Sequence, residues 1–138
     1  MNRFAGLALP VEQPARMIIQ TPDDTAPIRN RETGEEAWID LVSADSETAR
    51  AHERALRDRI LRNRRALSAE ESDQWNTELL AKLTRGWSLV TLAGDPIDLP
   101  FTEQAARELY AIPELRWIRD QVDRFVADRG NWLRRAKT

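Results

Sequence analysis

The order of apolar and polar residues divides the chain into an extended N-terminal part and a helical remainder. Short apolar runs at residues 17–19 and 38–42 are separated by prolines, acidic residues and Gly34, which is typical of strands joined by turns. We therefore predict a small β hairpin or meander over residues 15–42, preceded by a flexible N-terminal arm over residues 1–14.

Beyond residue 45, apolar residues recur every three or four positions, which indicates amphipathic helices. A residue suited to the start of a helix precedes each periodic segment, since a short side-chain oxygen accepts from the free amides of the first turn. The predicted helices cover about 47–67, 69–84, 103–111 and 114–134, with Asp45 or Ser46, Ser68, Thr102 and Pro113 at their starts.

Between the second and third helices the sequence predicts a short central β-hairpin. An extended run over residues 87–92 is followed by a turn that contains Gly94 and by a return over residues 97–99, and Gly86 is expected to end the preceding helix. The predicted fold class is thus mainly α within α+β, with one domain over residues 15–138. Its expected core is Trp38, Leu56, Ile60, Trp75, Leu79, Trp87, Phe101, Ile118, Val122 and Phe125.

Composition narrows the chemistry. The 138 residues contain no cysteine, which excludes disulfides and thiol chemistry, and the apolar run from Phe4 to Leu9 is too short for a secretory signal. No apolar run approaches the length of a membrane span, so we expect no membrane association and a cytoplasmic location.

No constellation of residues predicts catalysis. His52 is the only histidine and, without cysteine or a second histidine, cannot complete a zinc site, so we interpret it as a surface residue of its helix. The adjacent acids Asp23-Asp24, Glu35-Glu36 and Glu70-Glu71 point in different directions on a strand or helix. We therefore expect a protein that is not an enzyme, with no catalytic residue, metal, cofactor or small-molecule substrate.

The distribution of charge favours a binding role. The net charge is −2, but residues 47–67 carry seven arginines against three acids. A basic helix can follow phosphates. However, Glu53 and Asp58 interrupt this one and no aromatic residue is interleaved with the arginines, so nucleic acid is disfavoured and a solvated or protein-docking face is favoured. Trp132 and Arg134 fit either an anchor at the edge of the core or a partner contact. The predicted partner-binding residues are Arg57, Arg64, Arg65, Trp132 and Arg134.

The order of turns, helix starts and a final aromatic motif in this chain resembles that of the tail assembly chaperones of long-tailed phages. The similarity covers roughly residues 26–133 and includes a Gly-Trp pair entering a hairpin, a glycine turn, a Pro-Phe-Thr helix start and a final Asp-Arg-x-Asn-aromatic segment. These motifs are Gly86-Trp87, Gly94, Pro100-Phe101-Thr102 and Asp128-Arg129-Gly130-Asn131-Trp132, where Trp132 replaces the usual phenylalanine.

The resemblance implies a bacteriophage morphogenesis protein of the siphovirus type that acts by binding. Such chaperones hold the tape-measure protein soluble while tail-tube subunits assemble around it, then leave, so it implies residence in the host cytoplasm and absence from the mature virion. Its implied partners are the tape-measure and tail-tube proteins, and homo-oligomer formation stays open. Two alternatives remain: a structural tail or neck component retained in the virion, and a small helical nucleic-acid-binding regulator.

Overall fold

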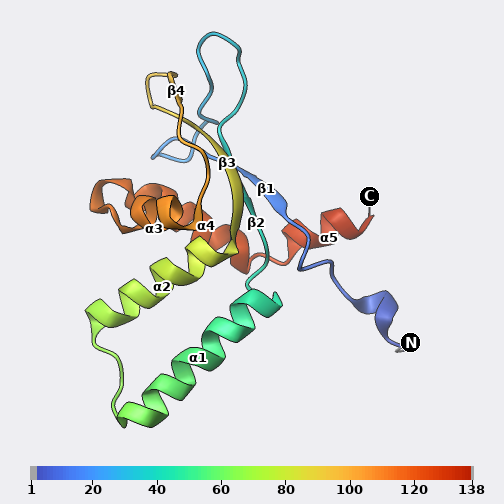
Figure 1. Ribbon diagram of the computed structural model, residues 1–138. Helices are drawn as coiled ribbons and strands as arrows, with labels where there is room; N and C mark the ends of the chain where they lie inside the picture. Colours follow the sequence, from blue (N-terminus) through green and yellow to red (C-terminus); the bar gives the residue numbers. More distant parts are fainter. Residues whose placement is uncertain (1–2, 138) are drawn as a thin grey trace.

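The computed structural model describes residues 3–137, so residues 1–2 of the predicted arm and residue 138 of the predicted domain lie outside the described residues. Helices and an antiparallel sheet form a mixed α+β, mainly helical fold, as the sequence predicts (Figure 1). In chain order the elements are η1 (Ala5–Leu7), β1 (Ala15–Ile18), β2 (Trp38–Leu41), α1 (Glu47–Asn63), α2 (Ala69–Leu83), β3 (Thr84–Val90), β4 (Pro96–Ile97), α3 (Glu103–Ala111), η2 (Pro113–Leu115), α4 (Arg116–Ala127) and α5 (Gly130–Lys137).

The two predicted β elements belong to one sheet. Its four strands lie in the order β1-β2-β3-β4 and every neighbouring pair is antiparallel. Strand β2 joins the two predicted β elements, because Ile39 lies opposite Met17 of β1 on one side and opposite Trp87 of β3 on the other. The helical hairpin α1–α2 therefore leaves the sheet after β2 and returns to it as β3.

The structure corrects the predicted end of the second helix. Helix α2 ends at Leu83 and the chain continues directly into β3, so Gly86 lies within a strand. The change occurs at Thr84, whose backbone is extended and whose hydroxyl contacts both the carbonyl oxygen of Leu80 and the hydroxyl of Tyr110, each over 2.8 Å. These hydrogen bonds of Thr84 end the helix, a role that the sequence analysis assigned to Gly86.

The predicted last helix is also interrupted. Helix α4 ends at Ala127, Asp128 is extended, and α5 begins at Gly130. The Asp128 carboxylate accepts from the backbone N–H of Gly130 over 2.9 Å, while the Asn131 side chain donates to the carbonyl oxygen of Phe125 over 2.9 Å. These short-range bonds stop one helix and start the next, although the apolar spacing continues through the break. The first helix is shorter than predicted as well and ends at Asn63.

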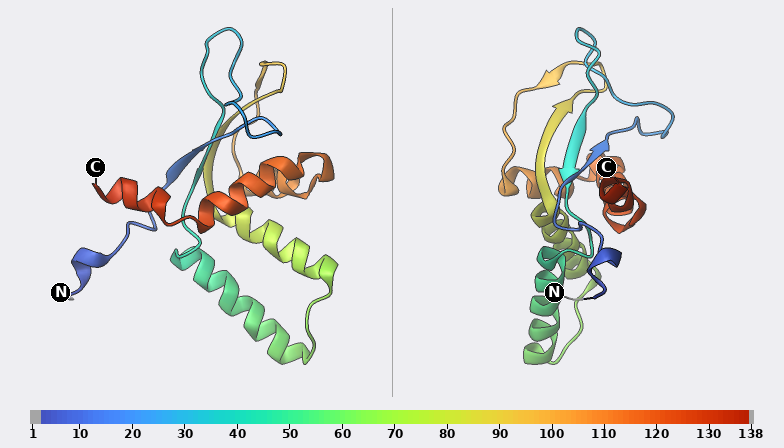
Figure 2. Two further views of the ribbon diagram at one scale, coloured as in Figure 1. Left: turned by 180° about the vertical axis from the view of Figure 1, so that it is seen from behind. Right: turned by 90° about the vertical axis from the view of Figure 1, so that its right-hand side faces the viewer.

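The core lies between the sheet and the helices α2, α3 and α4, with α4 across one face of the sheet, while the α1–α2 pair extends from one end of the body as a helical arm (Figure 2). Of the predicted core residues, Trp87, Ile118 and Val122 are buried and the other members are half-buried. Further side chains occupy the centre of the core, among them Ile39, Leu41, Leu80, Leu83, Tyr110 and Trp132.

Residues 11–13 of the predicted N-terminal arm are tied to the body. The carbonyl oxygen of Val11 accepts from the N–H of Ser43 over 3.2 Å, and the Glu12 carboxylate accepts from the N–H of Glu47 over 2.6 Å. Glu12 therefore satisfies one of the free amides at the start of α1. Only the part of the arm before Val11 projects away from the fold (Figure 1).

Candidate protein-binding surfaces

Helix α1 places the predicted arginines on the helical arm. Ser46 caps the helix by accepting from the N–H of Ala49 over 3.3 Å, which is one of the two caps that the sequence allowed. Arg57 is exposed on α1, and Arg64 is the C-cap residue immediately after it. Both therefore reach solvent, as a partner-binding role requires.

Arg65 has a different environment, because it holds the junction between α1 and α2 together. Its guanidinium contacts the Glu71 carboxylate at 3.0 Å, and Arg59 of α1 contacts the same carboxylate at 2.9 Å. Glu71 also accepts from the N–H of Ser68 in a complete capping box, as the sequence predicts. The Arg65 hydrogen bonds and those of Ser68 lower the pKa of Glu71 to about 2.

The inner face of the arm corrects the interpretation of His52. This side chain is only 3% exposed, and its ring stacks on Trp75 with centroids 4.6 Å apart. Its Nε2 atom lies 3.0 Å from the carbonyl oxygen of Trp75 and its Nδ1 atom 3.4 Å from the Lys82 ammonium. With a carbonyl acceptor on one side and a cationic donor on the other, His52 binds α1 to α2 and is not the surface residue that we predicted.

Trp132 is likewise removed from the predicted partner surface. Its side chain is 0% exposed, its ring lies 5.6 Å from that of Phe125, and its indole N–H donates to the carbonyl oxygen of Gln13. The sequence left two roles open for Trp132, an anchor in the core or a partner contact. In the structure Trp132 is an anchor in the core. Arg134 is exposed on α5 and donates to the Asn131 side chain.

The five predicted partner-binding residues therefore do not form one surface. Arg57, Arg64 and Arg65 belong to the helical arm, whereas Trp132 and Arg134 belong to α5, which lies beside β1 and the N-terminal segment (Figure 1). A single partner that touched all five would have to span both regions.

An apolar groove that the sequence did not predict opens between the sheet and the helices. It has a volume of about 310 Å³. Its floor consists of buried residues from the loop after β1, from β3, from α3 and from α4. Its rim consists of exposed or half-buried apolar residues of the β3–β4 turn, of β4, of η2 and of the start of α4. The lining includes Ile19, Ile28, Leu89, Leu92, Ile97, Leu109, Leu115, Trp117 and Ile118, with Glu114 as the one charged residue.

The rim of this groove is unusually apolar for a surface. Leu92 is 65% exposed and Ile97 is 43% exposed, and both line the groove. Contiguous exposed apolar side chains mark surfaces that interact with other molecules. The only sequence signal for this patch was the apolar character of the residues on both sides of the Gly94 turn, which we assigned to the hairpin itself.

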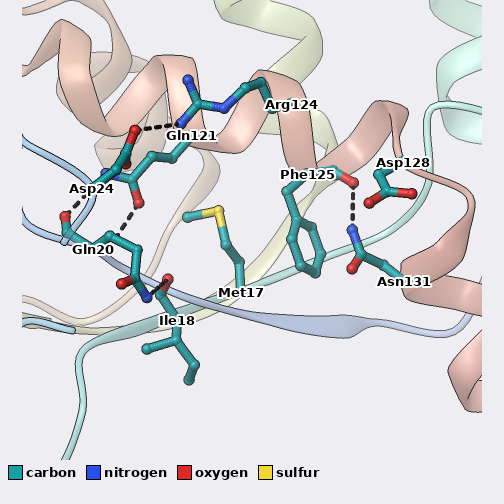
Figure 3. Close-up of a pocket in the computed structure, with 9 residues that line it drawn as sticks. All are labelled: Met17, Ile18, Gln20, Asp24, Gln121, Arg124, Phe125, Asp128 and Asn131. Carbon is teal, nitrogen blue, oxygen red and sulfur yellow. Dashed lines mark hydrogen bonds and ion pairs between the residues drawn. The ribbon is translucent and has the colours of Figure 1, made fainter. Parts of the chain in front are cut away.

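A second cavity, of about 240 Å³, lies between β1 and α4 and is lined by polar and charged side chains together with Met17, Ile18 and Phe125 (Figure 3). The Gln121 side chain bonds both backbone groups of Gln20, accepting over 2.9 Å and donating over 3.0 Å, and Arg124 contacts the Asp24 carboxylate at 3.4 Å. These groups are directed at one another across the cavity, so we interpret it as the joint that fixes α4 to the end of β1.

Comparison with known proteins finds no matching protein family, no matching curated protein and no matching solved structure. Within residues 3–137, no group of three histidine, cysteine or acidic side chains is arranged to hold a metal ion. No helix in the same part of the chain is both long and apolar enough to cross a membrane.

Proposed function

We propose that this protein is a tail assembly chaperone of a long-tailed phage that binds helical segments of the tape-measure protein without catalysing a reaction. The observation that carries the proposal is the apolar groove with its exposed rim at Leu92 and Ile97. The proposal also rests on the resemblance in the order of turns, helix starts and the final aromatic segment.

The lining of the groove favours a helix over a small molecule. Sites for small molecules combine an apolar pocket with several convergent polar groups that orient the ligand. Here Glu114 and Thr91 are the only charged or polar residues among the described residues of the lining. An amphipathic helix needs no such groups, because it binds through apolar anchors spaced three or four residues apart.

The acidic residue Glu114 at the rim favours a bound helix that carries basic residues. Glu114 is exposed at the mouth of the groove, and Asp98 is exposed just beyond β4. A lysine or arginine that flanks the apolar anchors of the bound helix would therefore meet negative charge. The favoured segment of the tape-measure protein is an amphipathic helix with an apolar stripe bordered by basic residues.

The test is co-expression with the tape-measure protein from the same genome. The wild-type chain should raise the soluble yield of that protein and co-purify with it, and the Leu92→Ser/Ile97→Ser variant should lose both effects. Both side chains are exposed, so the melting temperature should change little. The matched control is Leu7→Ser/Leu133→Ser, which removes two exposed leucines elsewhere and should behave as wild type.

Two outcomes would contradict the proposal. If the wild-type chain leaves the solubility of the tape-measure protein unchanged, the chaperone function is wrong. If both double variants keep full activity, the groove is not the binding site. Detection of the protein in purified, mature virions would instead favour the structural tail or neck component.

A further inference from the structure

The outer face of α1 presents a stripe of side chains directed away from α2. Arg54, Arg57 and Leu61 follow one another at steps of three and four residues, so they lie on the same side of the helix, and Arg64 follows three residues later as its C-cap. All four are exposed, and Leu61 is 74% exposed. We call these four residues the outer stripe. The opposite side of α1 carries the buried His52 and faces α2.

The charge of the outer stripe is only partly compensated within the chain. Arg54 contacts Glu47 at 2.5 Å, but Arg57 and Arg64 form no ion pair with any acid in residues 3–137. Their neighbours Arg59 and Arg65 differ, because both are held by Glu71. Two guanidinium groups thus flank the exposed side chain of Leu61 without an anionic partner in the described part of the chain.

The backbone at Arg64 is a second, independent observation. This residue ends α1 in the left-handed conformation, with φ 52° and ψ 35°. Glycine is the usual residue at such a helix end, because a Cβ atom is disfavoured there. Arg64 therefore imposes a conformational cost on the fold, and no ion pair within residues 3–137 offsets it.

We propose that the outer stripe binds an acidic amphipathic helix of a partner protein. Carboxylates seven residues apart on that helix, the same spacing as that between Arg57 and Arg64, would meet the two guanidinium groups in the bidentate geometry that guanidinium favours. An apolar residue between them would cover Leu61. Because the long axis of α1 is free along this face, the partner helix lies alongside α1.

A protein is favoured over nucleic acid by the apolar part of the outer stripe. Leu61 offers an apolar contact that a phosphate backbone does not use, and α1 carries no phenylalanine, tyrosine or tryptophan on which a base could stack. The inference goes beyond the proposed function, because the outer stripe lies on α1 and contributes no residue to the apolar groove. A negative result here therefore leaves the groove untouched.

The test uses a fluorescent synthetic helical peptide with glutamates and leucines along one face, a matched peptide with glutamine in place of glutamate, and a short DNA duplex. The wild-type chain should bind the glutamate peptide and not the other two. Arg57→Glu/Arg64→Glu should weaken that binding by about tenfold or more. The control variant Arg3→Glu makes the same kind of charge change on the exposed N-terminal arm and should leave binding unchanged.

Arg64→Gly separates binding from folding. Since glycine suits the left-handed backbone, this variant should melt about 2–4 °C higher than wild type while binding the glutamate peptide more weakly. Full peptide affinity in both Arg64→Gly and the double variant would overturn the proposal, as would equal binding of the glutamate and glutamine peptides. Preferential binding of the DNA duplex, lost in the double variant, would overturn it in favour of nucleic acid.

Discussion

The indole N–H of Trp132 donates to the backbone carbonyl oxygen of Gln13 over 2.9 Å. This bond joins α5 to the segment that precedes β1, residues that lie at opposite ends of the chain. Because Trp132 is 0% exposed and also contacts the Phe125 ring, it closes the side of the fold where α5 lies beside the segment that precedes β1. α5 is therefore an integral part of the domain.

Trp132→Ala should lower the free energy of unfolding by about 3–5 kcal/mol, because it leaves a large cavity. Trp132→Phe should cost less, since an aromatic ring remains and mainly the hydrogen bond to Gln13 is lost. The measurement is urea unfolding followed by circular dichroism. Leu133→Ala is the control, because its neighbouring side chain is 46% exposed, and it should change the stability by about 0.5 kcal/mol or less. A similar small loss for Trp132→Ala would place Trp132 outside the core.

His52→Ala should destabilise the protein by about 1–3 kcal/mol. The substitution removes the hydrogen bond to the carbonyl oxygen of Trp75 and the stacked ring, and it leaves a cavity in place of a side chain that is 3% exposed. The loss should appear in the unfolding free energy and as faster amide exchange in α1. Glu53→Ala, at the adjacent exposed position, serves as the control and should be nearly neutral. Equal stability of the two variants would contradict the buried role of His52.

Gly94→Ala should cost more stability than Gly34→Ala. Both glycines have a positive φ, 92° and 75°, so both variants pay for backbone strain. A Cβ atom at Gly34 meets nothing within 4 Å, whereas one at Gly94 would lie 2.9 Å from the Cβ atom of Arg31. Overpacking at this contact adds about 1–3 kcal/mol. Thermal melting of both variants measures the difference, and equal losses would show that the two loop tips are not packed together.

The helix starts were predictable because they depend on neighbouring residues. Ser68 and Glu71 form the capping box that their spacing indicates, and Thr102 caps α3 by accepting from the N–H of Ala105 over 2.9 Å. Helix ends were less predictable. Thr84 ends α2 through a hydroxyl contact with Tyr110, a residue on another helix. Such a contact exists only after the chain has folded.

The same reason explains the errors at the candidate sites. The burial of Trp132 involves a contact with Gln13, and the burial of His52 depends on the packing of α1 against α2. The apolar groove brings together residues from the loop after β1, from β3, from α3 and from α4, none of which carries a local motif. By contrast, Arg57 and Arg64 are exposed, in agreement with the solvated or protein-docking face that the sequence favoured, and their role in partner binding stays a prediction.

The single tyrosine of the chain supplies a prediction for alkaline pH. Tyr110 is 1% exposed, and burial raises the pKa of its hydroxyl to about 12, although the hydrogen bond to Thr84 acts in the opposite direction. In the unfolded chain the hydroxyl has a pKa of about 10. Between these values the unfolded chain releases a proton that the folded chain retains, so rising pH favours unfolding. The stabilising contribution is complete below pH of about 10 and is lost as the pH rises through about 12.

We therefore expect the folded protein to show no tyrosinate absorbance at pH of about 10–11, and its free energy of unfolding to fall by about 2–3 kcal/mol between pH of about 10 and 12. Denaturant unfolding at several alkaline pH values measures this slope. Tyr110→Phe keeps the buried ring and removes the ionising group, so its stability should depend less on pH in the same range. Tyrosinate absorbance at pH of about 10, with the circular dichroism spectrum of the folded protein retained, would show that the Tyr110 hydroxyl is not held in the core.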